Sequence, residues 1–342
     1  MTGIAYCTRE QVQDALAQAD TFRTNARIDA AIRTGAQQVE AQTRRFYPTT
    51  KTLYPEIRWV TGPVLWLDLD YTEMISVTSF TVDGVELVEG TDFFLRPDDG
   101  PPYTSLKLSN LSSASFSSND RGMVLIGEQG ASDTTRAAGS LSGSISSSAT
   151  TIVVSDASLI GVGDLLTIGS ERINVIERTY SSTGVALAGN VTASSAERTV
   201  TVDAGASLHE GERIRIGSER LFIESINGDV LTVRRAELGS QLAAHSTSDA
   251  VHAARTLTVE RGATGSTAAS HSSTAAILAN DPPALVKEAS LAYALVDLEQ
   301  SKSAYGRVVG AGDNQMEAAG RGLAAIVRDL IAMHGRIRHG AA

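Results

Sequence analysis

The chain has a single cysteine, Cys7, among its 342 residues, which excludes an internal disulfide. Aromatic residues make up only 5% of a chain that is 42% hydrophobic, so its cores must be packed mainly from aliphatic side chains and alanine. It has no apolar run of about 18 residues or more, and no basic-then-apolar signal pattern at the start. From these absences we expect a soluble chain that does not use the classical secretory route.

Lysine is scarce as well, with four residues against 25 arginines. The net charge is −10, and the acidic excess falls in two stretches. Residues 47–132 carry five basic and twelve acidic side chains, and residues 133–279 carry eleven and fifteen. Because tight binding to a phosphate backbone needs clustered Lys and Arg, this balance argues against it. An acidic surface serves solubility, and it would also suit a surface along which DNA slides without binding.

Catalytic and metal-binding signatures are missing too. The sequence contains no CxxC, HExxH or GxSxG motif, and its glycine pairs complete no phosphate-binding fingerprint. His245 and His271 occupy equivalent repeat positions and are the best metal candidates, but only His252 lies near them as a further ligand. The pattern therefore favours histidines that cap turns. We expect no enzyme activity, no metal and no cofactor.

Two acidic pairs are candidates for acid–base catalysis or calcium binding, but each has a simpler structural interpretation. Asp98 and Asp99 precede Gly100, which is typical of a solvated turn. Asp68 and Asp70 alternate along a predicted strand and so share one of its faces. Neither pair comes with the further ligands that a calcium site requires.

Helices are predicted at both ends of the chain. Thr8 and Gln11 have the spacing of a capping box, and a second amphipathic helix is expected from about residue 24 to 46. Near the other end, Pro282 and Pro283 lead a helix that runs to about residue 296. A final amphipathic helix starts near Met316 and is followed by a basic tail.

Between residues 51 and 132 the hydrophobic period changes to two, which predicts a small antiparallel β domain. Asp83-Gly84 separates two β-rich runs and has the composition of a tight hairpin turn. The expected strands are residues 64–69, 76–82, 93–97, 105–109 and 123–127.

An inserted segment, residues 133–279, carries two families of internal repeats. Residues 151–177 match residues 199–225 at an offset of 48, including GSER at 169–172 and 217–220. Residues 231–251 match residues 257–277 at an offset of 26. Alternating apolar and polar residues with Gly and Ser turns predict small β modules built by duplication.

These observations predict four segments and an α+β fold. The segments are N-terminal helices (1–50), a small antiparallel β domain (51–132), the inserted all-β repeat module (133–279) and C-terminal helices with a basic tail (280–342). In this fold, helices from both chain ends form the core. The ends of the inserted segment must then lie close together, and we expect its removal to leave the core folded.

The order of helix pair, β segment, Gly turn and the helix in PPALVKEASLAYAL resembles the head-to-tail connector (adaptor) ring proteins of tailed bacteriophages. The opening CTREQVQDAL with RIDAAIRTGAQQVEAQTRRFYP resembles theirs as well. The resemblance covers about 195 residues, 1–132 and 280–342, and rests on order and pattern. The LTVxRGxxGSxxAxH units resemble β elements that recur in phage virion proteins.

The resemblance implies a structural virion protein of the phage neck, assembled in the host cytoplasm. Its partners would be the portal protein, a tail-side neck or stopper protein and copies of itself in a ring, a dodecamer in this family. DNA would pass through the centre without sequence-specific binding, and no membrane is involved. The implied portal-docking residues are Arg328, Ile331, His334, Arg336, Ile337, Arg338 and His339.

Two other classes of function are alternatives. A carbohydrate- or cell-surface-binding virion module would use the β repeats for binding, but the inserted segment holds only Tyr180 and Phe222 as aromatic residues. Sugar binding normally relies on exposed aromatic rings, so this scarcity favours the structural function. The remaining class is a hydrolase whose site has no recognisable motif.

Overall fold

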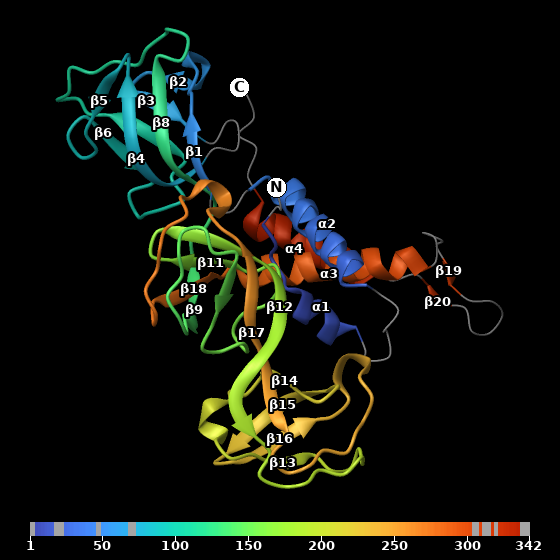
Figure 1. The fold of residues 1–342 in the computed structure, drawn as a ribbon. Coiled ribbons are helices and arrows are strands. Elements are labelled where there is room, and N and C mark those ends of the chain that lie inside the picture. Colours follow the sequence, from blue (N-terminus) through green and yellow to red (C-terminus); the bar gives the residue numbers. More distant parts are fainter. Residues whose placement is uncertain are drawn as a thin grey trace. The chain divides into compact units, whose positions relative to one another are not determined.

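The computed structural model describes residues 4–16, 24–45, 49–67, 73–302, 308–309, 316–317 and 321–335. Strands account for 38% of the structure and helices for 23%, so the protein is predominantly β (Figure 1). The expected α+β fold with a helical core is therefore wrong. The α-helices that the structure describes are confined to the chain ends, whereas most buried apolar side chains of the long middle segment lie within sheets.

The chain forms two compact units that do not follow the four expected segments. The repeat unit comprises Met1–Gln38, Thr135–Ala263 and Thr267–Ile326. The small β unit comprises Val39–Thr134, Thr264–Ser266 and Val327–Ala342. The N-terminal helices and the inserted segment thus belong largely to the same unit.

Two four-stranded sheets make up the small β unit. One has the order β1-β8-β4-β5 and the other β2-β3-β7-β6, with antiparallel neighbours. Phe80 and Phe93 meet edge to face in its core, with ring centroids 5.6 Å apart. The strands are β1 (Thr49–Leu53), β2 (Val60–Thr61), β3 (Val64–Trp66), β4 (Met74–Val82), β5 (Val85–Leu87), β6 (Phe93–Arg96), β7 (Ser105–Leu108) and β8 (Met123–Gln129).

The predicted hairpin at Asp83-Gly84 is confirmed. It joins β4 to β5, and both turn residues have positive φ, 48° for Asp83 and 81° for Gly84. Asp83 also accepts hydrogen bonds from the Ser117 hydroxyl and the Asn119 amide, at 2.8 and 2.9 Å. These bonds lower the pKa of Asp83, so its carboxylate helps to hold the turn.

In the repeat unit, helices from the two ends of the chain pack together. The predicted capping box of α1 (Arg9–Ala15) is confirmed at Thr8 and Gln11. Gly35 allows close approach of α2 (Asn25–Thr43) to α3 (Ala284–Lys302), because a Cβ at this position would lie 2.5 Å from the Ser290 carbonyl oxygen. The buried residues of this helix cluster are Cys7, Val12, Ile28, Ala31, Ile32, Ala294 and Leu298.

The inserted segment folds into two modules with separate hydrophobic cores. The outer module consists of residues 135–178 and 255–280, and the inner module of residues 183–254. Long strands β12 (Glu171–Ala186) and β17 (Ala250–Glu260) pair along their length and connect the two modules (Figure 1). The other strands are β9 (Thr135–Ser140), β10 (Thr151–Val153), β11 (Leu165–Ile168) and β18 (Ala276–Asn280) in the outer module, and β13 (Thr199–Thr201), β14 (Arg213–Ile216), β15 (Glu219–Asn227) and β16 (Val230–Arg234) in the inner one.

The inner module is inserted into the outer one. Each module combines one copy of the repeat whose copies are offset by 48 residues with one copy of the repeat whose copies are offset by 26. The copies that form the inner module therefore lie between those that form the outer module. The bridges Ile145–His271 and Val191–His245 are equivalent in the two modules. The ends of the inserted segment lie side by side as predicted, because Thr135 of β9 pairs with Asn280 of β18.

The remaining elements are short or lie near the C-terminus. Helix α4 spans Arg321–His334. Strands β19 (Val308–Val309) and β20 (Met316–Glu317) pair with each other. Short 3-10 turns occur at Ile57–Trp59, Gly205–Ser207, Glu237–Gly239 and Ala263–Gly265.

Candidate functional site

A fully buried carboxylate lies at the centre of the inner module. Glu219 accepts two hydrogen bonds from the Arg235 guanidinium, both at 2.7 Å. It also accepts from the backbone N–H groups of Ala236 and Ala243, at 3.0 and 3.1 Å, and lies 2.8 Å from His245 Nε2. The carboxylate therefore ties the loop after β16 to the GSER hairpin between β14 and β15.

The outer module repeats this arrangement around Glu171. Its carboxylate accepts two 2.7 Å hydrogen bonds from Arg261, and His271 Nε2 lies 2.8 Å away. Backbone N–H groups of Gly262 and Ala269 complete the set, at 3.1 and 3.0 Å. We call these two groups the Glu–Arg–His clusters. They explain why GSER and the two histidines recur in the repeats.

Neither cluster is suited to acid–base or metal chemistry. Burial alone would raise the pKa of Glu171 and Glu219, but the arginine, histidine and backbone donors outweigh it and lower both values to about 2. A carboxylate that accepts five hydrogen bonds has little capacity left for a substrate. Within the residues the structure describes, no group of three His, Cys, Asp or Glu side chains is placed to hold a metal. We interpret the clusters as structural.

The depressed pKa values predict loss of stability in acid. In the unfolded chain each carboxyl group titrates near 4.5, whereas in the folded module it titrates near 2. Their stabilising contribution is therefore complete above about pH 5 and disappears as the pH falls towards 2. We expect the free energy of unfolding, measured by urea denaturation at a series of pH values, to fall over this range. A flat profile between pH 5 and 3 would contradict the prediction.

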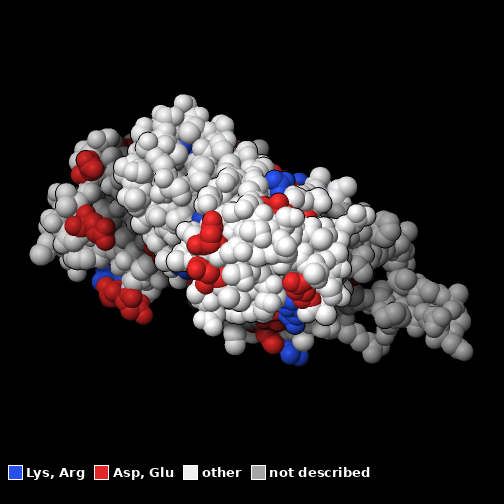
Figure 2. All heavy atoms as spheres, turned by 60° about the horizontal axis from the view of Figure 1, so that its bottom comes forward, with Lys and Arg blue, Asp and Glu red and all other residues white. Residues whose placement is uncertain are grey.

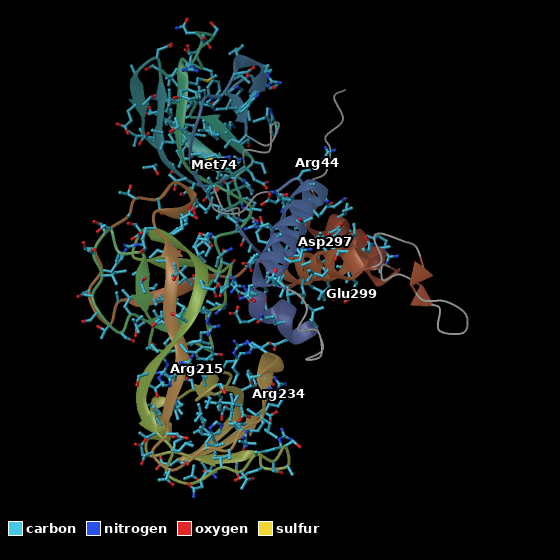
Figure 3. The ribbon with its side chains drawn as sticks, turned by 45° about the vertical axis from the view of Figure 1, so that its right-hand side comes forward. Arg44, Met74, Arg215, Arg234, Asp297 and Glu299 are labelled. Atoms are coloured by element: carbon cyan, nitrogen blue, oxygen red, sulfur yellow. The ribbon has the colours of Figure 1, made fainter. Side chains whose placement is uncertain are left out.

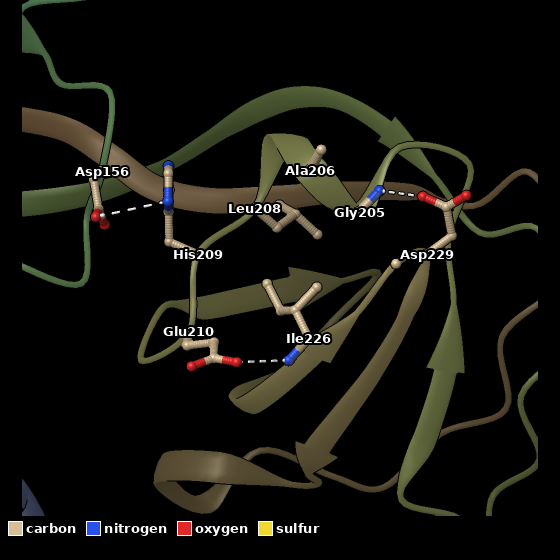
Figure 4. Close-up of a pocket in the computed structure, with 9 residues that line it drawn as sticks. Asp156, Gly205, Ala206, Leu208, His209, Glu210, Ile226 and Asp229 are labelled. Carbon is tan, nitrogen blue, oxygen red and sulfur yellow. Dashed lines mark hydrogen bonds and ion pairs between the residues drawn. The ribbon is translucent and has the colours of Figure 1, made fainter.

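An open pocket of about 560 Å³ lies beside the inner module (Figure 4). Glu210 accepts a 3.0 Å hydrogen bond from the Ile226 N–H, and Asp229 accepts one of 2.8 Å from the Gly205 N–H. His209 Nδ1 lies 3.8 Å from a carboxylate oxygen of Asp156. The carboxylates of Glu210 and Asp229 thus fix the conformation of loops through their backbone hydrogen bonds. This function explains their presence in the pocket without catalysis.

The structure describes three of the seven residues that the resemblance assigns to portal docking. Arg328 is exposed, and its Nε donates to Asp329 at 3.1 Å. Ile331 is 43% exposed. His334 is half-buried, and burial together with nearby Arg45 lowers its pKa. The residues Arg336, Ile337, Arg338 and His339 lie outside the described residues.

Helix α4 presents apolar side chains to solvent. Leu330 is fully buried, but its neighbour Ile331 and the nearby Met333 are 43% and 74% exposed. Two exposed apolar side chains do not by themselves make an interaction surface.

A network of ion pairs joins α1 to the inserted segment, and sequence reasoning did not identify it. The Arg9 guanidinium is 5% exposed and lies 2.7 Å from Asp29 and 2.6 Å from Glu177. Burial alone would lower the pKa of Arg9, but these two carboxylates raise it above its usual range. Glu10 accepts from the Val162 N–H at 2.8 Å and lies 3.2 Å from Arg178.

Charged atoms on the face shown in Figure 2 occur in small separate groups. Among the described residues on that face, basic atoms do not merge into a broad patch. A surface that holds a nucleic-acid backbone tightly needs such a patch. This face therefore gives no support for extended phosphate-backbone binding.

Comparisons of the chain with protein-family models, with curated proteins and with solved structures found no match. Among the described residues, no helix combines the length and hydrophobicity needed to cross a bilayer.

Proposed function

We propose that this protein is a structural component of the phage neck, a head-to-tail adaptor that forms a ring between the portal and the tail around the DNA channel. Its partners are the portal protein, a tail-side neck or stopper protein and further copies of itself. The function is non-enzymatic and needs no cofactor. The support comes from the order of elements on which the resemblance rests, together with the packing of the chain ends.

That packing is the observation that carries the proposal. Cys7 Sγ lies 3.7 Å from Ser290 Oγ, although 283 positions separate the two residues. Helices α1, α2 and α3 thus share one apolar cluster in spite of the long inserted segment. This agrees with an ancestral host domain that acquired the repeat modules later, as the resemblance implies.

The alternative, a carbohydrate-binding module, is disfavoured by the environment of its two aromatic rings. Arg213 and Arg234 lie over the Phe222 ring, at 5.8 and 4.7 Å from its centroid, and Arg215 lies 5.3 Å from the Tyr180 centroid. Sugar binding uses aromatic faces that are free to stack on the ligand. These two rings are already engaged with guanidinium groups.

The proposal predicts that ring assembly depends on the portal. We expect a monomer or labile oligomer in isolation, and rings with a central hole when the protein is mixed with portal assemblies of the same phage. A closed ring needs a heterologous interface, with two different faces on each subunit. Light scattering of the free protein and negative-stain micrographs of the mixture test this. A tight two-fold dimer that persists with the portal would contradict it.

A C-terminal truncation tests whether the last residues dock on the portal. Removal of residues 334–342 should leave the circular dichroism spectrum almost unchanged and abolish portal binding. A second variant, in which a Gly/Ser tail of equal length replaces these residues, controls for chain length. Normal portal binding by either variant would show that the C-terminal residues do not dock.

A further inference from the structure

One face of the inner module gathers arginine side chains from neighbouring strands. Ile214 and Ile216 are fully buried in the module core, so Arg213 and Arg215, which alternate with them on β14, point to the opposite face. Arg220 of β15 lies directly across from Arg215. Like charges at directly opposed positions destabilise a sheet. The arrangement is therefore costly unless an anion compensates for it.

The row of basic side chains extends to the next strand. Strand β14 lies between β15 and β17, and His252 of β17 pairs with Arg215 on the side opposite Arg220. Figure 3 shows Arg215 and Arg234 in the same part of the inner module. Among the described residues, the Nε atoms of Arg213 and Arg215 and the Nδ1 atom of His252 are buried and have no hydrogen-bond partner. Buried polar atoms of this kind normally have a hydrogen-bond partner, and the two arginine Nε–H groups require an acceptor.

The outer module shows that the fold does not require these residues. Its equivalent strands have the same register, with Leu166 opposite Ile173 where the inner module has Ile214 opposite Leu221. In place of Arg213, Arg215, Arg220 and His252, the outer module has Leu165, Thr167, Arg172 and Leu278. Three of the four basic positions are thus specific to the inner module, and only Arg220 has a basic equivalent, Arg172. The concentration of basic side chains on one face of the inner module points to a binding function.

A small cavity adjoins this face. Its volume is about 130 Å³, and its lining includes Arg9, Arg178, Arg213, Arg220 and Tyr180 together with the carboxylates of Glu10 and Glu177. Arg178 lies 3.2 Å from Glu10, and Arg213 pairs with Asp14. Among the described residues, no carboxylate pairs with Arg220 or with Arg215. Of the four arginines that line the cavity, Arg220 is thus the one for which the described residues offer no paired carboxylate.

The electrostatics of Tyr180 show how closely the guanidinium groups converge. Burial raises the pKa of its hydroxyl, and four arginines act in the opposite direction. All four guanidinium groups thus favour the charged form of the same hydroxyl. The four are Arg220, Arg213, Arg178 and Arg215.

We propose that the cavity lined by Arg178, Arg213, Arg220 and Tyr180, with Arg215 and His252 on the adjoining strands, binds a phosphate group. A tetrahedral phosphate presents several strong acceptor oxygens and up to two negative charges, which suits guanidinium groups that approach from different strands. A planar carboxylate offers only two oxygens. The cavity is well below the size of typical small-molecule sites, so it admits a single group, either free phosphate or one phosphodiester of a nucleic acid.

Calorimetric titration of the full chain with inorganic phosphate, at constant ionic strength, tests the proposal. We expect saturable binding that Arg220→Gln weakens by about tenfold or more, because a charge-assisted hydrogen bond is lost. Arg172→Gln is the matched control, since Arg172 occupies the equivalent position in the outer module, and it should bind as the unmodified protein does. Tyr180→Phe removes only a hydroxyl and serves as a second variant if Arg220→Gln fails to fold.

A short single-stranded oligonucleotide distinguishes the two sources of phosphate. Tighter binding of the oligonucleotide than of free phosphate, lost in the same variants, would identify a phosphodiester. Binding of phosphate without binding of the oligonucleotide would identify the free anion. The proposal is overturned if the unmodified protein binds neither probe, or if Arg220→Gln and Arg172→Gln weaken binding equally.

Discussion

Replacing Glu219 by glutamine is expected to lower the free energy of unfolding of the inner module by about 3–5 kcal/mol. The Arg235 side chain is only 2% exposed and depends on this carboxylate for its charge compensation. Glutamine has almost the same shape, but it removes the negative charge. Its amide nitrogen would also face the donors that Glu219 now accepts from, namely Arg235 and two backbone N–H groups. A buried, uncompensated guanidinium is the main cause of the expected loss.

Hydrogen exchange followed by mass spectrometry can locate this effect. We expect faster exchange across residues 183–254 in Glu219→Gln, whereas the outer module should keep its protection because it has its own core and its own cluster. Glu224→Gln is the matched control, since Glu224 makes an ion pair with Arg198 at the surface of the same module. It should change stability by less than about 1 kcal/mol. Similar effects of the two substitutions would contradict the structural importance of the cluster.

Local features were predictable from the sequence because short-range chemistry determines them. The capping box at Thr8 and the hairpin at Asp83-Gly84 each depend on a few adjacent residues, and both were confirmed. The repeats predicted β modules and equivalent positions for His245 and His271. They also contained a signal that sequence reasoning missed. Both copies of the first repeat family, residues 151–177 and 199–225, precede both copies of the second, residues 231–251 and 257–277. This order is expected when one module is inserted into another, whereas tandem modules would alternate the two families.

Long-range features were not predictable in the same way. One of the two carboxylate partners of Arg9 is Glu177, 168 positions away, and nothing in the pattern of α1 marks Arg9 as a buried residue. The α+β prediction was wrong because periodicity identifies helices and strands but does not show how much of the buried apolar core each of them contributes. The helical stripes were identified, but most of the apolar burial is in the sheets. Of the expected docking residues, only Arg328, Ile331 and His334 lie in the described part of the chain.

The contacts of α1 change what is expected from removal of the inserted segment. If a Gly/Ser linker replaces residues 136–278, we expect the helices at the chain ends to lose their cooperative fold. The Arg9 N–H donates to the Val162 carbonyl at 3.0 Å, and Glu10 accepts from the Val162 N–H. Arg9 would also lose Glu177. A helix of seven residues is too short to persist without such tertiary contacts.

Circular dichroism and urea denaturation of the linker variant test this expectation, with the full chain measured under the same conditions. Arg9→Leu in the full chain isolates the central ion pairs. Because Asp29 and Glu177 remain partly solvated, with side chains 25% and 41% exposed, we expect a loss of about 2–3 kcal/mol, less than for a pair with both partners buried. The exposed Arg58, which pairs with Glu56, provides the control, and Arg58→Leu should have little effect. Native helix content and cooperative unfolding in the linker variant would show instead that the repeat modules are accessory, as the sequence alone suggested. A linker variant without its helices, together with a weakened Arg9→Leu chain, would show that the host helices now depend on the segment inserted between them.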